Sequence, residues 1–513
     1  MIRSGIVREN RYFDSMFLMQ VRQRMEREPG VHQAAAVMGT DTNKGLLGRL
    51  GFTGPWLSAA GPNDLIVAVE GESSEIIRAV LDRLEEFLTQ KVKEREERPR
   101  TLAAGLAVLP QANLAVISVP GRFAAREART ALERGLNVFL FSSNVSVEDE
   151  IALKSLAHER GLLVMGPDCG TAIIRGMGIG FANVVRRGSI GIVGSSGTGI
   201  QEVTCLVHQS GQGVSHAIGT GSRDLSEAVG GVSTWAALGV LEDDPDTKVI
   251  VLVSKPPGAK LLATLRARLQ KCRKPAVACL LGTGKLDSLW EQVHLVSTLD
   301  AAAARAVELV GGRTAVPESP DPTTWAASVV REQAQMSSEQ KYVRGIFAGG
   351  TFCYEAQHVL EQGGIAVHSN APLDRRFALD DPMRSVGHTL LDLGDEQFTE
   401  GRAHPMIDAA LRQERLHMEA RDAEVAVILL DFILGYNASP DPVRDLLPAI
   451  EQAKRTAADR GGHLSVVASV CGTDGDPQGL QLQVTALEEA GVVVLPSNAQ
   501  AASYCQMLVG NSR

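Results

Sequence analysis

Two short stretches rich in glycine, serine and threonine carry a pattern typical of anion binding. Gly191-Ile-Val-Gly-Ser-Ser-Gly-Thr198 and Gly345-Ile-Phe-Ala-Gly-Gly-Thr351 each join an apolar strand to the start of a helix. Such a turn leaves backbone N–H groups unpaired at the positive end of a helix dipole, where phosphate and carboxylate groups bind. The sequence therefore predicts two turns that bind phosphate or substrate, with these members: Ser195, Ser196, Gly197, Thr198, Gly349, Gly350 and Thr351.

Better-known motifs do not describe these turns. Neither turn has the G-K-[ST] of a P-loop, the G-x-G-x-x-G of a dinucleotide site or the G-x-S-x-G of a hydrolase. Close packing alone explains glycine-rich turns in many α/β sheets, and it is the alternative interpretation of each turn. The presence of two matched copies favours anion binding.

Other polar residues follow predicted strands and could contact the same anion. Lys255 stands at the end of an apolar strand, where a fixed cation suits a phosphate or a carboxylate; a lysine in solvent is the alternative. Gly221 and Arg223 follow another strand, and the guanidinium could bind a substrate carboxylate in a bidentate manner. An internal salt bridge is the alternative for Arg223.

A histidine and a carboxylate four residues apart form a candidate acid/base pair. His404 and Asp408 could share one helix face near the interface between the repeats. Turn and helix-cap roles are the alternative. With Lys255 they make up the candidate catalytic residues.

The composition limits the class of protein. The chain has 513 residues, 44% hydrophobic and 22% charged, with a formal net charge of -9. This acidic balance argues against nucleic-acid binding, and no apolar run approaches the roughly 20 residues of a membrane helix. Residues 1–20 lack the apolar core of a secretory signal, so we expect a cytoplasmic protein.

The seven cysteines are scattered without a C-x-x-C pair, which predicts reduced thiols and no metal site.

Periodicity predicts an α/β protein with several doubly wound parallel sheets. Residues 1–98 alternate strand, helix, strand, strand, helix, which is typical of a small α+β module. Apolar runs then alternate with helical periods, as in parallel strands covered on both faces. We predict a Rossmann-like domain at 99–186, flavodoxin-like domains at 187–312 and 341–513, and a proline-containing linker at 313–340.

The last two domains resemble each other as a divergent internal repeat. In both anion-binding turns the threonine is followed four residues later by a glutamate, Glu202 or Glu355. Ala276–Thr283 and Val466–Thr473 also correspond, and the second copy carries an insertion around Leu391–Met418. The repeat predicts two similar sheets that face one another.

Several stretches resemble known families. Leu114-Ala-Val-Ile-Ser-Val-Pro120 and Met165-Gly-Pro-Asp-Cys-Gly170, with the first turn, resemble the succinyl-CoA synthetase α subunit, and the last domain resembles the end of the β subunit. The chain is most similar to the FdrA family, over nearly its whole length, at Tyr12–Asp14, Asn43–Gly45, Gly219–Ser226 and His404–Asp408. The resemblance implies a CoA-binding type of domain at 99–186 and possible CoA contacts at Pro120, Arg122, Phe123, Ser142 and Asn144.

Departures from the synthetase pattern bear on the reaction. The phosphohistidine loop of those enzymes is replaced by Leu281–Asp287, and the nearby His294 begins an apolar strand, which favours a structural role. Lys255 stands where the synthetases have a glutamate. No segment matches their ATP-grasp module, and the first phosphate loop of the CoA-binding domain has no counterpart before Leu102. We therefore expect no ATP use by this chain alone.

Three functions are consistent with these observations. The favoured one, implied by the FdrA resemblance, is one subunit of a carbamoyltransferase of allantoin breakdown that converts oxalurate and phosphate into oxamate and carbamoyl phosphate. The second is an acyl-CoA synthetase component that relies on other chains for the ATP-dependent steps. The third is a ligand-sensing or assembly protein without catalysis. The expected partners are small anions, other subunits and, by analogy, further copies of the chain, with no certain cofactor.

Overall fold

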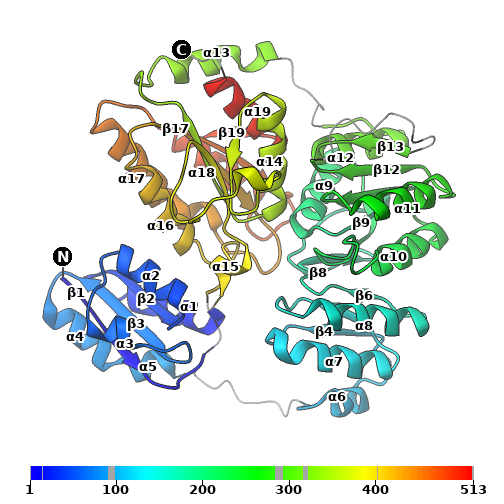
Figure 1. Ribbon diagram of the computed structural model, residues 1–513, viewed down its shortest axis with the longest axis horizontal. Coiled ribbons are helices and arrows are strands. Elements are labelled where there is room, and N and C mark those ends of the chain that lie inside the picture. The colour runs from blue at the N-terminus through cyan, green and yellow to red at the C-terminus, as the bar shows by residue number, and fades with distance from the viewer. Residues whose placement is uncertain are drawn as a thin grey trace. The chain divides into compact units, whose positions relative to one another are not determined.

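Two compact units make up the chain. The computed structural model describes residues 2–13, 15–89, 99–282, 290, 293–315, 322–400 and 402–510 (Figure 1). One unit contains residues 1–99 and 393–414, and the other contains residues 100–392 and 415–513. Most of a charged run at residues 91–100 and most of the loop at Leu281–Asp287 lie outside the described residues. No helix of the described chain is both long and apolar enough to cross a membrane.

The first unit is built on an antiparallel sheet of three strands. Its order is β1-β3-β2, with bounds Ile2–Arg8, Leu65–Gly71 and Val31–Met38. Every residue of the central strand β3 is buried because helices cover both faces of the sheet. Leu65, Val67 and Val69 contact one hydrophobic cluster, and Ile66 and Ala68 contact the other. The helices are α1 (Ser15–Glu26), α2 (Asp41–Arg49), α3 (Pro55–Ala59), α4 (Ser74–Asp82) and α5 (Leu84–Leu88).

The insertion at 393–414 folds with this module, although the sequence assigned it to the domain at 341–513. It contains α15 (Glu396–Thr399) and the start of α16 (Ala410–Glu419). Arg402 Nε donates to Oδ1 of the buried Asn43 at 2.6 Å, and Arg22 donates to Asp408 at 2.8 Å. Polar side chains therefore join the insertion to the N-terminal module.

A small parallel sheet follows in the second unit. Its order is β4-β5-β6, with bounds Leu114–Ile117, Asn137–Leu140 and Val164–Met165. Its helices are α6 (Leu102–Val108), α7 (Gly121–Glu133) and α8 (Val147–Glu159). Ala124, Ala128 and Ala131 recur on the buried face of α7, so the helix lies close to the strands. The described residues from 99 to 113 contain α6 and no strand.

The two larger sheets have related but different strand orders. The first has the order β13-β12-β11-β9-β10-β7-β8 and the second has the order β15-β16-β14-β17-β18-β19. In the first, β9 lies between the next two strands of the chain, β10 and β11, which is the flavodoxin-like arrangement. In the second, β14 lies between β16 and β17, and β15 pairs with the outer side of β16. The bounds are Thr171–Ile174 (β7), Met177–Gly180 (β8), Arg187–Gly194 (β9), Val214–Gly219 (β10), Val249–Ser254 (β11), Ala276–Leu280 (β12), Val293–Val296 (β13), Tyr342–Phe347 (β14), Val367–His368 (β15), His388–Asp392 (β16), Val425–Ile433 (β17), Ser465–Cys471 (β18) and Val493–Leu495 (β19). β7 and β8 thus belong to this sheet, although the sequence placed them in the domain at 99–186.

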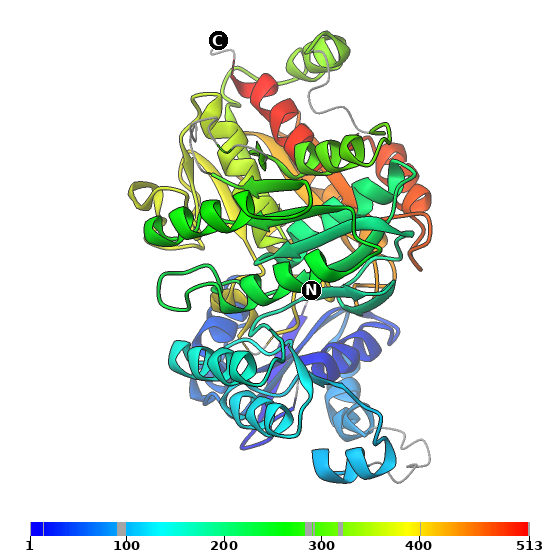
Figure 2. The same cartoon turned by 90° about the vertical axis from the view of Figure 1, so that its right-hand side faces the viewer.

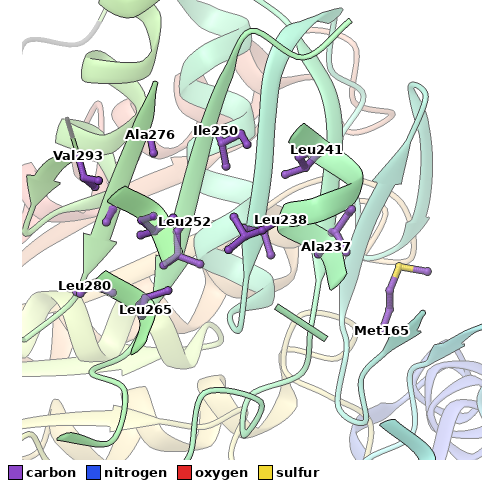
Figure 3. Close-up of a cluster of buried hydrophobic side chains, with 14 of the residues drawn as sticks. Met165, Ala237, Leu238, Leu241, Ile250, Leu252, Leu265, Ala276, Leu280 and Val293 are labelled. Atoms are coloured by element: carbon purple, nitrogen blue, oxygen red, sulfur yellow. The ribbon is translucent and has the colours of Figure 1, made fainter. Parts of the chain in front are cut away.

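Helices cover both faces of each large sheet. In the first, α10 (Val232–Asp243) and α11 (Ala259–Gln270) lie on the face turned to the viewer in Figure 2. Leu238 of α10 and Leu265 of α11 belong to one cluster with Ile250 and Leu252 of β11 (Figure 3). The other face carries α9 (Gly197–Gln209) and α12 (Leu299–Leu309). The second sheet has α14 (Gly350–Gln362), α17 (Pro442–Ala458), α18 (Leu480–Glu489) and α19 (Asn498–Val509).

Two expectations about helices were wrong in part. The linker predicted at 313–340 contains α13 (Pro322–Gln333), and Ser328 of this helix hydrogen-bonds Tyr504 of α19 at 2.8 Å. Apolar residues such as Val329 were the overlooked signal, because they give this proline-containing segment a face that packs. The last helix of the α+β module, which the periodicity of residues 75–94 predicts as one continuous helix, is divided at Arg83 into α4 and α5 within its described part.

A buried ion network joins the small parallel sheet to the first large domain. Lys154 of α8 is fully buried, and its Nζ lies 2.7 Å from Glu150 and 2.7 Å from Asp224. Asp224 also accepts the backbone N–H groups of Ser233 and Thr234 at the start of α10. The lysine therefore pairs with Asp224, which has no access to water, and shares the buried Glu150 with Arg223.

We expect Lys154→Met to lower the free energy of unfolding by about 3–5 kcal/mol, because it leaves the buried Asp224 carboxylate without its cation. Arg126→Met is the control, since Arg126 is 78% exposed and its ion pair with Glu127 is worth at most about 1 kcal/mol. Urea unfolding of both variants measures the difference. A Lys154→Met chain as stable as the control would contradict the role of the network.

Candidate functional site

The first predicted turn caps helix α9 and retains unsatisfied donors. Ser196 is the N-cap, and its Oγ accepts the backbone N–H of Gly199 at 3.0 Å. Ser195 Oγ lies 2.8 Å from Ser254 Oγ at the end of β11. The N–H groups of Gly197 and Thr198 have no acceptor among the described residues. The turn thus keeps two donors at the positive end of a helix of 13 residues.

The second turn differs because it holds carboxylates of its own. Asp431 of β17 accepts the N–H groups of Ala348 and Gly349, at 2.9 and 2.7 Å from the nearer oxygen. A Cβ atom on Gly350 would lie 2.3 Å from Asp392 Oδ2, so this second carboxylate also stands at the start of α14. The expectation of two equivalent anion-binding turns is therefore wrong in this respect: part of the second turn already binds an acidic side chain.

The two turns meet directly. Ser196 Oγ and Thr351 Oγ1 are 2.5 Å apart, and both side chains are buried. A Cβ atom on Gly349 would lie 3.0 Å from the methyl group of Thr198, so glycine permits the close approach. The starts of α9 and α14, from equivalent places in the two domains, therefore face each other across one contact.

Lys255 supplies a cation beside this contact. It follows β11, and its Nζ lies 5.2 Å from the centre of the Tyr354 ring of α14, within the range of a cation–π interaction. Burial raises the pKa of the Cys353 thiol, and the charge of Lys255 acts on the same thiol in the opposite direction. Lys255 is thus directed toward the first turns of α14, and only half buried.

A group of buried carboxyl groups lies one helical turn behind the meeting point. Glu202 of α9, Asp300 of α12 and Glu355 of α14 are at most 3% exposed, and we call them the carboxyl seam. Burial raises the pKa of Glu202 to about 7 and that of Glu355 to about 8, and it also raises the pKa of Asp300. The mutual repulsion of Asp300 and Glu355 adds to the shift. At neutral pH the seam therefore holds protons.

The structure does not support Arg223 and Gly221 as substrate ligands. Arg223 Nε donates to Glu150 at 3.0 Å and its NH2 group donates to the carbonyl of Val145 at 2.7 Å, so the alternative of an internal salt bridge holds. Gly221 has a positive φ of 88°, and a Cβ atom there would lie 2.4 Å from the carbonyl oxygen of Pro167. Close backbone packing explains this glycine.

His404 and Asp408 do not form an acid/base pair on a helix. They lie in a turn of the compact unit that contains the N-terminal module, whereas the two anion-binding turns belong to the other unit. His404 Nδ1 accepts the N–H of Met406, while Asp408 binds Arg22 and accepts the N–H of Ala410. Burial lowers the pKa of His404 to about 4. Turn and cap roles, the alternative interpretation, describe both residues.

The expected CoA contacts gather at the carboxyl ends of two neighbouring strands. Pro120 caps α7 after β4, while Ser142 and Asn144 follow β5, and Ser142 Oγ donates to the carbonyl of Val119 at 2.6 Å. The Arg122 guanidinium lies 4.8 Å from the centre of the exposed Phe123 ring. His294 of β13 contacts Arg305 at 3.1 Å, in keeping with its expected structural role.

Sequence reasoning missed the carboxylates around the second turn. Asp431 is an acidic residue within the otherwise apolar strand Val425–Ile433, and such an isolated charge in a buried strand was the available signal. The sequence identifies Glu202 and Glu355 as equivalent positions of the repeat, but their spacing does not show that the two carboxyl groups interact.

Comparisons with known proteins agree with this architecture. A family model described as CoA-ligase matches residues 346–508, and one described as AllF, heavy metal-associated domain, matches residues 1–102. The Escherichia coli (strain K12) protein YahF is 45% identical over 496 residues, which cover 96% of each chain. This chain belongs to the same family as YahF.

More distant relatives cover less of the chain. The subunit alpha 2 of an ADP-forming succinate–CoA ligase from Archaeoglobus fulgidus is 31% identical over 148 residues, 28% of this chain and 50% of that subunit. A solved dinucleotide-forming acetyl-coenzyme A synthetase from Ca. Korarchaeum cryptofilum is 15% identical, covers 78% of this chain and 82% of its own, and gives a TM-score of 0.33.

The N-terminal module of this family member does not fit a heavy-metal site. Soft metal ions are held by thiolate and imidazole ligands, and the first cysteine of the chain is Cys169, far beyond the module. No group of three or more histidine, cysteine or acidic residues in the described chain could hold a metal ion. The loop between β1 and α1 carries Asn10, Arg11 and Tyr12 instead.

The raised pKa values of Glu202 and Glu355 predict a stability that depends on pH. The folded chain keeps protons that the unfolded chain releases above its ordinary glutamate pKa, so stability falls as pH rises through the folded values. Between about pH 6 and about pH 8.5 we expect a loss of about 1–3 kcal/mol in urea unfolding. Glu202→Gln should reduce this loss, whereas the exposed control Glu159→Gln should not. Equal pH dependence in all three proteins would contradict the assignment.

Proposed function

We propose that this chain is one subunit of a carbamoyltransferase that converts oxalurate and phosphate into oxamate and carbamoyl phosphate in the use of allantoin nitrogen. The observation that carries the proposal is the meeting of the α9 and α14 turns beside Lys255. The match of the N-terminal module to the AllF model, together with the resemblance to the FdrA family, supports the choice of reaction. The absence of a phosphohistidine loop and of an ATP-grasp segment from the sequence also favours a transferase over a ligase.

The reaction needs a bound phosphate and a leaving nitrogen. A phosphate oxygen attacks the ureido carbon of oxalurate, and the bond between this carbon and the nitrogen of the oxamate part breaks. The proton of hydrogen phosphate moves to the leaving nitrogen, so that carbamoyl phosphate and oxamate form. Positioned donors lower the barrier by holding phosphate in line with the carbonyl carbon and by stabilising the negative charge that develops on its oxygen.

The two unlike turns suit the two reactants. The N–H groups of Gly197 and Thr198 and the Lys255 ammonium are donors for phosphate. Asp392 at the start of α14 is an acceptor, and the terminal NH2 of a ureido group is a donor that a carboxylate binds. In this proposal the first turn binds the anion and the second turn selects the carbamoyl group. We do not assign the oxalyl carboxylate to Arg223, because its guanidinium already donates hydrogen bonds to Glu150 and to the carbonyl of Val145.

An acyl-CoA synthetase component is the second candidate. The observation that favours it is the grouping of Pro120, Arg122, Phe123, Ser142 and Asn144 at one edge of the β4-β5-β6 sheet, in a chain whose residues 346–508 match the CoA-ligase model. This candidate requires CoA binding and separate chains for the ATP-dependent steps. Thermal stabilisation by CoA would support it, whereas stabilisation by phosphate or oxamate without CoA would support the carbamoyltransferase.

Lys255→Met should weaken phosphate binding about 10- to 100-fold, because a hydrogen bond to a charged group is worth about 1.5–3 kcal/mol. Lys260→Met is the matched control, since Lys260 is exposed at the start of α11 and should leave the affinity unchanged. Isothermal titration calorimetry with inorganic phosphate measures both variants. Equal affinity of the Lys255→Met and control proteins for phosphate would show that Lys255 does not contribute to the site.

Phosphorolysis of oxalurate tests the reaction itself. We expect carbamoyl phosphate to form when this chain is combined with the products of neighbouring genes, and to be lost in the Lys255→Met complex. The exposed-lysine variant Lys260→Met should remain active in the same complex. If the chain neither binds an anion nor supports turnover, and only copurifies with its partners, the ligand-sensing or assembly function would replace the proposal.

A further inference from the structure

The carboxyl seam links the two repeated domains in a reciprocal way. Glu202 of α9 accepts the backbone N–H of Asn498, the first residue of α19 in the other domain, at 3.3 Å. Glu355 of α14 accepts the N–H of Leu299, the first residue of α12 in the first domain, at 2.7 Å. Each domain therefore provides a carboxyl group that caps the last helix of the other.

The remaining contacts of the seam are hydrogen bonds. Asn498 Nδ2 donates to Glu355 Oε2 at 2.7 Å and to the carbonyl of Phe352 at 3.0 Å. Ser497 donates to Asp300 Oδ2 at 2.8 Å, and Thr298 donates to its Oδ1 at 2.6 Å. These donors are neutral, so they orient the carboxyl groups without compensating a full negative charge on each.

Among the described residues, the neighbouring titratable groups that shift the pKa values of Glu202 and Glu355 are acids. Asp300, Asp431 and the Cys471 thiol act on Glu202, while Asp300 and Glu202 act on Glu355. The thiols of Cys205 and Cys279 lie near enough to be influenced by the charges of the same carboxyl groups. No lysine or arginine forms an ion pair with Glu202, Asp300 or Glu355 in the described chain. Ionising every carboxyl group here would place like charges together away from water, at a cost of several kcal/mol.

The seam is joined to the anion-binding turns by short stretches of helix. Glu202 follows Thr198 by four residues on α9, and Glu355 follows Thr351 by four residues on α14. One helical turn is rigid, so a displacement of the glutamates is also a displacement of the turns. The distance of 2.5 Å between the Ser196 and Thr351 hydroxyl oxygens therefore depends on how closely the seam packs.

We propose that Glu202 and Glu355 are positioning residues: as neutral acids they hold the two turns at the distance that the anion requires, and the loss of their protons separates the turns. The inference rests on the proposed anion site and adds to it a dependence on pH. When the carboxyl groups ionise, repulsion and the entry of water loosen the caps of α12 and α19. The anion then loses the paired arrangement of α9 and α14, although neither glutamate touches it.

Sulfate is the probe for the test, because its charge does not change in the range where the seam titrates. We expect the affinity of the full chain for sulfate, measured by calorimetry at constant ionic strength, to fall about tenfold between about pH 6 and about pH 8.5. Glu202→Gln keeps an oxygen for the Asn498 N–H but cannot ionise, and Asp300→Asn removes a neighbouring charge. Both variants should flatten the profile, while Glu159→Gln should follow the unmodified protein. A Glu202→Gln profile as steep as that of the unmodified protein, or an unmodified profile that is already flat, would overturn the inference.

A second measurement does not depend on the anion. Hydrogen exchange at the first turns of α12 and α19, corrected for the intrinsic effect of pH, reports the caps of Leu299 and Asn498 directly. We expect protection there to fall at high pH in the unmodified chain and to persist in Glu202→Gln. If sulfate binds at no pH, the proposed anion site is wrong. The hydrogen-exchange measurement then tests by itself whether ionisation of the carboxyl seam loosens the starts of α12 and α19. Protection that does not change with pH would overturn the role of the seam.

Discussion

The packing of α9, α12, α14 and α19 between two parallel sheets requires that every buried helix terminus find a hydrogen-bond partner. A helix end away from water leaves N–H groups unsatisfied, and each such group costs about 1–3 kcal/mol. Glu202 and Glu355 satisfy the starts of α19 and α12 across the interface, and Asp431 satisfies the strand-to-helix turn before α14. The first turn of α9 keeps free donors within the described chain. This asymmetry between equivalent positions is the reason why we locate the anion at α9.

The same constraint explains why duplication did not give two identical sites. In the first domain the position equivalent to Asp431 lies in β11, an apolar strand that ends in Ser254 and is followed by Lys255. A hydroxyl group and a cation at this strand end leave the neighbouring turn able to accept an external anion. In the second domain a carboxylate from the strand fills part of the turn. A ligand with one anionic and one N–H-bearing end matches such a pair better than two phosphates would.

The fold class and the repeated domains could be predicted from the sequence. Continuous apolar strands, small residues at strand ends and the matched glutamates predicted α/β architecture with two flavodoxin-like domains that face each other. The helix at Pro322–Gln333 and the division at Arg83 escaped prediction, because proline content and a continuous helical period outweighed weaker local signals. The assignment of residues 393–414 to the N-terminal unit could not have been deduced, since it depends on contacts such as Arg402 with Asn43, which are 359 positions apart.

The candidate site was less predictable than the fold, because side-chain partners at long range determine it. Arg223 and His404 are suitable residue types for a site. However, Arg223 pairs with Glu150, and His404 accepts the backbone N–H of Met406 within a turn. The direct test of the account is anomalous diffraction from crystals of the full chain soaked in selenate, a tetrahedral oxyanion like phosphate. We predict one strong selenium peak within hydrogen-bonding distance of the Gly197 and Thr198 backbone nitrogens and near Lys255 Nζ. The account would be contradicted if no peak appeared there at a selenate concentration that saturates binding in solution, or if a peak appeared only at another place in the fold.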